Sequence, residues 1–137
     1  MLKVTKTVRF DAAHILTNHA GLCKNLHGHT YRVDVTVAQA PDDARDMVID
    51  FKDLKHVCEA EILARFDHAF IYDETSPGES EIAGVLAKYA MRTAALPFRS
   101  TAENLARYFF SVLAPRVPGL LSVRVWETPD SVAEYVC

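Results

Sequence analysis

Two early runs of alternating apolar and polar side chains most constrain how this chain can fold. Residues 3–14 carry β-branched and aromatic side chains at alternate positions, and in residues 27–37 valines alternate with polar residues from Val33 to Val37. A period of two residues is typical of a strand that buries one face. The sequence therefore predicts a long hairpin, in which residues 16–26 connect two antiparallel strands.

Three later segments have the apolar spacing of a helix that packs one face on a core. Asp50 is a good N-cap for the first of them, and Ser100 with Glu103 fits the capping box of the third. The predicted helices span residues 51–66, residues 79–91 and a stretch that begins at residue 100.

Two strands, residues 121–127 and 131–136, are predicted to end the chain. This order of elements predicts an α+β fold, with a four-stranded antiparallel sheet and helices on one of its faces. The length of 137 residues and the absence of a linker predict a single domain over residues 1–137. Such a sheet has two open edges, which pairing with further copies of the chain would cover, so we expect a homo-oligomer.

Charge and composition exclude several classes of partner. The net charge is −3, so the chain has no overall basic field to attract nucleic acid or a membrane surface. No segment has the roughly 18 consecutive apolar residues that span a bilayer, and the first residues lack the apolar region of a signal peptide. Three cysteines, Cys23, Cys58 and Cys137, do not form a disulfide framework. We therefore expect a cytoplasmic protein with reduced thiols.

Three histidines near the N-terminus predict a metal site. His27 and His29 flank Gly28, so both imidazoles point to the same face of the second strand. His14 ends the first strand and lies opposite the start of the second one in an antiparallel hairpin. Three converging imidazoles are typical zinc ligands. A lone His-x-His pair is a weak signal, and the alternative is three unrelated histidines, but the position of His14 favours a metal.

Cys23 decides between two kinds of metal site. Three protein ligands with an open position are typical of catalytic zinc, whereas a fourth ligand from Cys23 would make the site structural. Lys24 and a nearby dication would both lower the pKa of the Cys23 thiol and favour a thiolate that acts as base or nucleophile. An exposed loop cysteine without a role is the remaining alternative. Cys58, in contrast, lies on the apolar stripe of a predicted helix and is expected to be buried and inert.

Two further positions are candidates for acid–base chemistry. Asp67 and His68 follow the first predicted helix, and an imidazole beside a carboxylate can relay protons near neutral pH. A histidine at a helix end is also a common feature without function. Glu127 ends a strand on its apolar side, where a carboxylate needs a hydrogen-bond donor unless it emerges into solvent.

Six motifs, in order, resemble one known family over essentially the whole chain. The chain is similar to the 6-pyruvoyl-tetrahydropterin synthase and 6-carboxytetrahydropterin synthase family, and most similar to its 6-carboxy branch. The matching motifs are FDAAH (10–14), CKNLHGHTYRV (23–33), MVIDFKDLK (47–55), FDHAF (66–70), STAENLA (100–106) and VWET (125–128).

The resemblance implies a T-fold (tunnelling fold) subunit that assembles into a barrel-like homo-oligomer, usually a hexamer of two stacked trimers with active sites between subunits. It implies a zinc ion held by His14, His27 and His29. The residues that it implies for proton transfer are Cys23 as proton acceptor, His68 and Glu127 as partners in the relay, and Asp67 to orient His68. Those implied for the pterin ring are Glu127, Thr101 and Glu103.

The implied substrate is 7,8-dihydroneopterin triphosphate, which an enzyme of the 6-carboxy branch converts to 6-carboxy-5,6,7,8-tetrahydropterin, triphosphate and acetaldehyde on the route to queuosine-type deazapurines. Only three residues separate Cys23 from His27, the compact spacing of the 6-carboxy enzymes. The alternatives are a 6-pyruvoyl synthase and a non-catalytic zinc or pterin-binding module. Asp73 and the long segment 69–99 depart from the pattern of compact family members and affect the expected pocket mouth.

Overall fold

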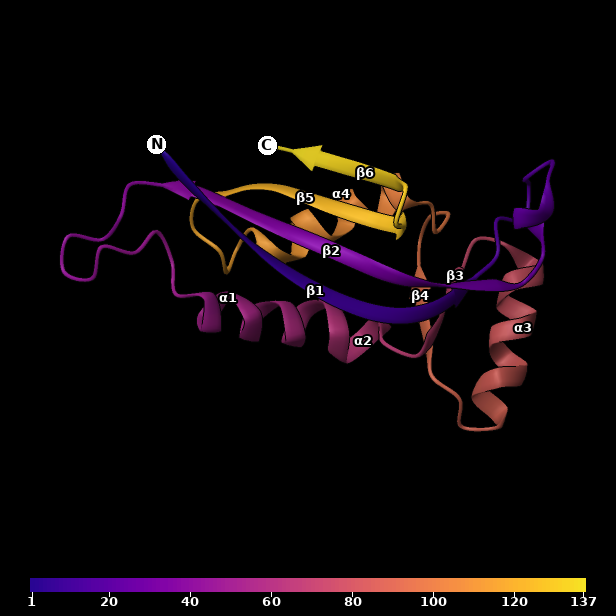
Figure 1. Ribbon diagram of the computed structural model, residues 1–137. Coiled ribbons are helices and arrows are strands. Elements are labelled where there is room, and N and C mark those ends of the chain that lie inside the picture. Colours follow the sequence, from indigo (N-terminus) through magenta and orange to yellow (C-terminus); the bar gives the residue numbers. More distant parts are fainter.

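A long two-stranded hairpin forms the centre of the molecule (Figure 1). The computed structural model describes all residues from 1 to 137. Strand β1 (Leu2–His14) pairs antiparallel with β2 (His27–Gln39), and the register runs without a break from Leu2 opposite Gln39 to His14 opposite His27. The hairpin predicted from the alternating pattern is therefore confirmed.

The sheet has six strands of mixed direction, in the order β4-β3-β1-β2-β5-β6, so the prediction of four antiparallel strands was wrong. The predicted strands β5 (Leu120–Thr128) and β6 (Ser131–Val136) extend the β2 side as an antiparallel meander. On the other side, β3 (Ala69–Asp73) runs parallel to β1, and β4 (Thr93–Leu96) runs parallel to β3. Both strands are short, and β3 is a continuous apolar run without alternation, which periodicity does not distinguish from a buried helix.

The first predicted helix is present with its predicted bounds. It consists of α1 (Phe51–Cys58), a π-helical segment η2 (Glu59–Leu63) and α2 (Ala64–Phe66), and Asp50 caps it by accepting a hydrogen bond from the Lys52 backbone N–H at 2.8 Å. Cys58 is buried in this helix, and burial raises the pKa of its thiol to about 11. This thiol is therefore inert, as expected.

The last helix begins one residue later than its predicted capping box. In α4 (Ala102–Leu113) the N-cap is Thr101, whose hydroxyl oxygen accepts a hydrogen bond from the Asn104 backbone N–H at 3.2 Å. Ser100 precedes the cap and is fully buried. The prediction that Ser100 caps the helix was therefore wrong. Its backbone carbonyl group instead forms a hydrogen bond with His14, as described below.

The helices do not all cover the same face of the sheet. The helices α1, α2 and α4 enclose a core of 25 buried residues, which includes Ala69 and Ile71 of β3. Phe70 points to the opposite face, where it packs with Ala83 of α3 (Pro77–Lys88) in a separate small cluster. Because neighbouring residues of a strand face opposite ways, α3 lies on the face opposite to the other helices. The expectation of helices on one face was therefore wrong for α3.

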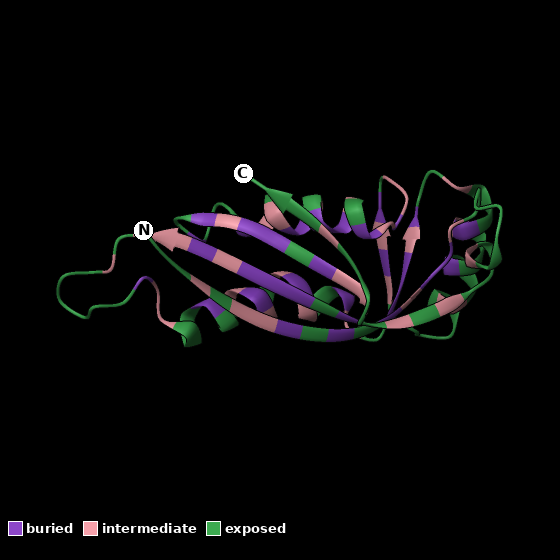
Figure 2. Cartoon of the chain, turned by 45° about the horizontal axis from the view of Figure 1, so that its top comes forward, coloured by how far each residue is buried: buried purple, intermediate pink, exposed green.

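Buried and exposed residues alternate along the central strands (Figure 2). The core is rich in aromatic side chains: Phe10 stacks on Tyr31 with ring centroids 5.0 Å apart, and Phe66 meets Phe109 edge-on at 5.3 Å. Along β1 and β2, this aromatic core is followed by His14 and His29 on the same face. The histidines therefore lie on the core face of the sheet, directly beside the aromatic side chains.

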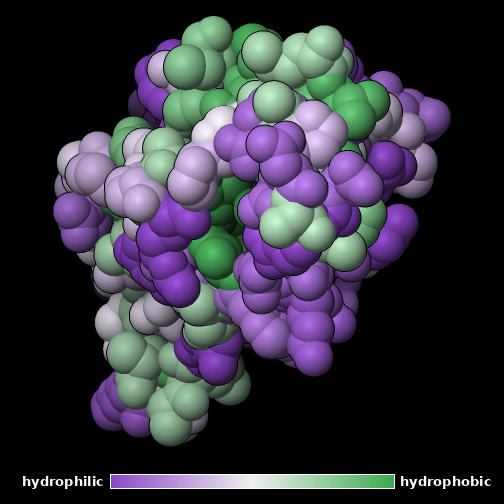
Figure 3. Space-filling view, turned by 90° about the vertical axis from the view of Figure 1, so that its left-hand side faces the viewer, coloured by the Kyte–Doolittle hydropathy of each residue, from purple (hydrophilic) through white to green (hydrophobic).

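The two ends of the molecule differ in chemistry. Figure 3 shows the end away from His14, where hydrophobic atoms appear in a hollow between hydrophilic ones. A pocket of about 260 Å³ at this end is lined by residues that include Val4, Met47 and Phe51. Both groups of potential metal ligands lie elsewhere, near the other end of the hairpin. No helix of the chain is long and apolar enough to cross a membrane.

Candidate active site

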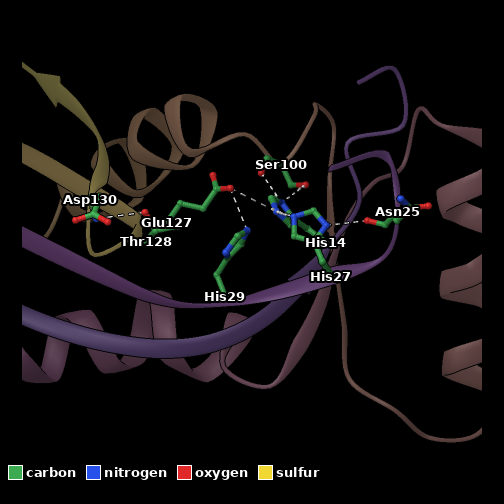
Figure 4. Close-up of polar contacts among 8 residues, drawn as sticks. All are labelled: His14, Asn25, His27, His29, Ser100, Glu127, Thr128 and Asp130. Carbon is green, nitrogen blue, oxygen red and sulfur yellow. Dashed lines mark hydrogen bonds and ion pairs between the residues drawn. The ribbon is translucent and has the colours of Figure 1, made fainter. Parts of the chain in front are cut away.

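Three histidines and a glutamate point toward one another where the hairpin ends (Figure 4). The Nε2 atoms of His14 and His27 lie 3.0 Å apart, and Nε2 of His29 lies 3.0 Å from Oε1 of Glu127. One ligand atom from each of the four residues lies within 4.8 Å of the others. This convergence follows from the strand register, because His14 lies directly opposite His27 and His29 is two residues further along the same face.

Backbone carbonyl groups orient two of the imidazoles. Nδ1 of His14 donates to the carbonyl oxygen of Ser100 at 2.9 Å, and Nδ1 of His27 donates to the carbonyl oxygen of Asn25 at 2.7 Å. Because a carbonyl oxygen only accepts, each Nδ1 carries the proton and each Nε2 presents its lone pair to the cluster. Sequence reasoning missed Ser100 and Asn25 in this role, since a backbone carbonyl has no residue-type signature.

In His14 and His29, burial favours the neutral form of the imidazole, which is the form that binds metals. The pKa of His14 is lowered to about 4, mainly by desolvation; the hydrogen bond to Ser100 opposes this shift, and the neighbouring His27 and His29 add to it. Desolvation also lowers the pKa of His29, although Glu127 opposes the shift. Neutral imidazoles at neutral pH are ready to bind a cation without releasing a proton.

The arrangement fits a metal ion. Nε2 of His29 is buried and makes no well-oriented hydrogen bond, even though Glu127 is close. A buried polar nitrogen without a partner is costly unless another group satisfies it. Three imidazole nitrogens with a carboxylate oxygen form a donor set typical of first-row transition metals. The residues that could hold the ion are His14, His27, His29 and Glu127.

Tyr31 is a further neighbour of this cluster that sequence reasoning missed. Its ring packs against His14 and His29, with centroids 6.0 Å and 5.4 Å away. Burial, together with the negative charge of Glu127, raises the pKa of its hydroxyl, which has no hydrogen-bond partner in the protein. The signal in the sequence was its position, two residues after His29 on the same strand face.

Asp67 and His68 form a second cluster. Nδ1 of His68 lies 2.9 Å from Oδ1 of Asp67, which also accepts a hydrogen bond from the backbone N–H of Asp11 at 3.1 Å. The backbone N–H of His68 donates to the carbonyl oxygen of Asp11, and His68 has a positive φ of 61°. The side chain of His68 is thereby presented to solvent, with Asp67 fixing its orientation.

One pocket borders both clusters. It has a volume of about 700 Å³ and is lined by His29 from the first cluster, His68 from the second, and Leu86, Met91 and Arg92 from the segment around the end of α3. A second pocket of about 530 Å³ is lined by Glu127 and also reaches His29. Both groups of ionisable residues therefore face space that a small molecule can enter.

The other predicted residues lie outside these clusters. Cys23 is half-buried in a short 3₁₀ turn, η1 (Leu22–Lys24), and belongs to neither group of potential ligands. Its absence from the histidine group leaves Glu127 as the fourth residue of that group. Thr101 caps α4, and Glu103 is exposed in the first turn of the same helix.

A pocket bordered by an acid–base pair and by a potential metal-binding group defines this chain as a candidate enzyme acting on a small molecule. Comparison with known proteins specifies the family. Residues 3–136 match the family model described as 6-pyruvoyl tetrahydropterin synthase. The chain belongs to this family, and it is therefore an enzyme of the tetrahydropterin synthase type.

Relatives in bacteria carry a more specific name. The chain is 45% identical to a Haemophilus influenzae protein named 6-carboxy-5,6,7,8-tetrahydropterin synthase, over 98% of this chain and 99% of the relative. It is 36% identical to an Aquifex aeolicus protein of the same name, over 97% of this chain and 96% of that one. The family resemblance inferred from the sequence motifs is thus confirmed.

Solved structures confirm the T-fold. A Caenorhabditis elegans 6-pyruvoyl tetrahydropterin synthase superposes with a TM-score of 0.74 at 24% identity, covering 99% of this chain and 95% of the other. An uncharacterised protein from Wolinella succinogenes superposes with a TM-score of 0.82 at 22% identity, covering 98% and 97% of the two chains. At these identities the likeness concerns the fold alone.

Proposed function

We propose that this protein converts 7,8-dihydroneopterin triphosphate and one water molecule to 6-carboxy-5,6,7,8-tetrahydropterin, triphosphate and acetaldehyde, in queuosine and 7-deazapurine biosynthesis. The observation that carries the proposal is the convergence of His14, His27, His29 and Glu127, beside a pocket that is lined by His29 of this group and by His68. The 45% and 36% identity to relatives named for this activity supports the 6-carboxy product.

Zinc is the proposed metal, held by His14, His27 and His29, and when bound it supplies a Lewis acid that acidifies a side-chain hydroxyl group of the substrate and polarises a carbonyl. The lowered pKa values of His14 and His29 and the unpartnered Nε2 of His29 support this assignment.

The chain's own residues carry the proton transfers in this proposal. The Cys23 thiolate removes a carbon-bound proton, and His68, oriented by Asp67 at 2.9 Å, returns a proton at another atom. The elimination of triphosphate needs no hydrolytic nucleophile. The role of Glu127 is to accept hydrogen bonds from the pterin ring and to take part in the relay, and Thr101 and Glu103 line the pterin pocket.

A homo-oligomer, a hexamer of two stacked trimers with sites between subunits, is part of the proposal. The strands at the two edges of the sheet, β4 and β6, have one unpaired side each, and β6 exposes Val132 and Val136. Such edges are suited to pairing with another copy. The separation of Cys23 from both ligand groups within one chain also favours a site that a second copy completes. Light scattering on the purified protein tests the assembly.

A single domain over residues 1–137 and a cytoplasmic location complete the proposal. All three cysteines are free, which suits a reducing compartment. The elements from β1 to β6 share one continuous sheet, which supports folding as one domain. Cooperative unfolding with a single transition tests the domain assignment.

Product analysis tests the reaction. The zinc-loaded protein is incubated with 7,8-dihydroneopterin triphosphate, and the expected products are 6-carboxy-5,6,7,8-tetrahydropterin and acetaldehyde. A pterin that keeps its three-carbon side chain would instead identify the alternative, a 6-pyruvoyl synthase. Substrate that binds without being consumed would identify the non-catalytic module.

The Cys23→Ala variant tests the catalytic role of the thiol. We expect it to abolish turnover while bound zinc stays near one per chain, because Cys23 lies outside the histidine group. Cys137→Ser is the matched control, since Cys137 is an exposed free thiol at the end of the chain. Loss of zinc from Cys23→Ala would contradict the proposal and favour a structural metal site.

A further inference from the structure

A buried carboxyl group on α3 has no part in the proposed reaction. Glu79 is 1% exposed, and it lies in the first turn of α3. Its Oε1 atom accepts a hydrogen bond from the Asp73 backbone N–H at 3.2 Å, and its Oε2 atom accepts one from the Thr17 hydroxyl at 3.0 Å. Because Ser76 already caps α3, helix capping does not account for Glu79.

The hydrogen bond to Thr17 links α3 to the connection that carries Cys23. Thr17 follows Leu16, and the backbone N–H of Leu16 donates to the carbonyl oxygen of Cys23 at 2.9 Å. This bond closes the connection between β1 and β2 into a loop. The position of Cys23 therefore depends on Leu16, whose neighbour is fixed by Glu79.

Apolar packing supports the same attachment. Ile15, one residue before Leu16, packs with Phe70 of β3 and Ala83 of α3 in the small cluster on the α3 face. Figure 1 shows α3 and the connection between β1 and β2 at the same end of the molecule. The first part of the connection is thus held by α3, through one apolar contact and one hydrogen bond.

The last part of the connection is held by a histidine of the candidate metal site. The carbonyl oxygen of Asn25 accepts the hydrogen bond from Nδ1 of His27, as Figure 4 shows. Cys23 consequently lies between two fixed points: Thr17, which is hydrogen-bonded to Glu79 of α3, and Asn25, which is hydrogen-bonded to the candidate metal ligand His27. A shift of either point moves the thiol relative to the histidines.

We propose that Glu79 is a positioning residue that sets the place of the Cys23 thiol through Thr17 and Leu16. The proposal rests on the proposed catalytic function of Cys23. The side chain of Glu79 is held in one orientation because donors bind both of its buried carboxyl oxygens. Movement away from either donor would leave a buried oxygen unpaired, which is costly. Glu79 thereby acts on catalysis through Thr17 and Leu16, not through contact with the substrate.

Substitution of Thr17 tests the link while leaving Glu79 and α3 intact. Thr17→Val has the same shape but removes the donor to Oε2 of Glu79, whereas Thr17→Ser keeps it. We expect Thr17→Val to lower the hydrogen-exchange protection of the Leu16 amide and to lower kcat, each about tenfold, with little change in KM or zinc content. Thr17→Ser should restore both quantities to within about twofold of the wild type.

A second hydroxyl provides the matched control. Thr5 forms a hydrogen bond with Thr36 at 2.8 Å, far along the hairpin from Cys23. Thr5→Val removes that bond and should leave both kcat and the protection of the Leu16 amide unchanged. A mere loss of stability in Thr17→Val would lower protection across the whole sheet rather than at Leu16, and it would overturn the positioning role.

The two proposals fail in different ways. Unchanged kcat in Thr17→Val, with or without altered protection at Leu16, overturns the role of Glu79. Full activity in Cys23→Ala overturns the proposed function instead. Glu79→Gln adds an independent check, because its amide oxygen still accepts from the Asp73 N–H and its amide nitrogen can donate to the Thr17 oxygen. It should retain more activity than Glu79→Ala.

Discussion

His14 and Ser100 are joined by a hydrogen bond of 2.9 Å between residues 86 positions apart in the sequence. The donor is the imidazole Nδ1 and the acceptor is a backbone carbonyl, so the bond fixes both the tautomer and the plane of the ring. Ser100 lies immediately before Thr101, the N-cap of α4. The start of this helix is therefore part of the support of the candidate metal centre.

Removing the helix cap should weaken metal binding. Thr101→Ala deletes the hydroxyl oxygen that accepts the Asn104 N–H, and loss of such a cap costs about 1 kcal/mol of stability. Because the first turn of α4 then frays, the Ser100 carbonyl moves relative to His14, and metal affinity should fall several-fold. Denaturant unfolding and metal titration measure the two effects. Thr101→Ser keeps the cap and should behave like the wild type; equal metal affinity in all three proteins would contradict the link.

Removing one imidazole should remove the metal. We expect His29→Ala to lower bound metal from about one ion per chain to near zero, because it deletes one of three imidazole nitrogen donors. Elemental analysis of the purified proteins measures the content. His56→Ala is the control, since His56 is an exposed histidine on α1 outside both ligand groups. Retention of the metal in His29→Ala would show that the histidine cluster does not bind it.

The sequence predicted those parts of the fold that depend on periodicity. Alternation along β1 and β2 indicated the hairpin, and the parity of the histidines indicated that they converge, as the register confirms. Strand β3 was missed because a short run buried on both faces has no alternation, and β4 because four residues are too few to show a period. The parallel pairing of β3 with β4 also requires that α3 cross over between them, and this connection could not be recognised from local sequence patterns.

Contacts that involve the backbone could not be predicted from residue types. The carbonyl groups of Ser100 and Asn25 orient His14 and His27, and any residue at those positions supplies the same oxygen. The inward position of Glu127 was predictable from strand parity, whereas its proximity to His29 depends on the pairing of β2 with β5. The sequence thus indicates which side chains form the site, but not the backbone groups and strand pairings that hold those side chains in place.

Asp34 should make stability depend on pH in the acidic range. Burial alone would raise the pKa of this carboxyl, but hydrogen bonds from Thr7, Arg32 and Trp126 outweigh burial and lower it. A lowered pKa in the folded state means that Asp34 contributes stability above the pKa of the unfolded chain, about 4, and that this contribution is lost as pH falls through the folded value.

Asp34→Asn should therefore destabilise the protein by about 2 kcal/mol at neutral pH, because it loses charge-assisted hydrogen bonds. The difference from the wild type should shrink as the pH falls below about 4. Denaturant unfolding across the pH range measures it. Asp43→Asn, in an exposed loop, should match the wild type at every pH. A pH-independent difference for Asp34→Asn would contradict the assignment.

Gly28 should be required between the two histidines of β2 because a side chain there meets the backbone of β1. A Cβ atom at Gly28 would lie 3.0 Å from the carbonyl oxygen of Ala12, closer than most Cβ contacts, and a paired strand cannot shift cheaply. We expect Gly28→Ala to displace His27 and His29, to cost about 1 kcal/mol of stability and to weaken metal binding about tenfold.

Gly84 provides the matched control for this substitution. It lies in α3, and a Cβ atom there would meet nothing within 4 Å. Gly84→Ala should leave metal affinity unchanged and stabilise the protein by about 0.5–1 kcal/mol, because alanine loses less backbone freedom than glycine when a helix forms. Metal titration and denaturant unfolding on both variants separate the two cases. If Gly28→Ala binds metal as tightly as Gly84→Ala, the close approach of β1 and β2 does not set the geometry of the histidines.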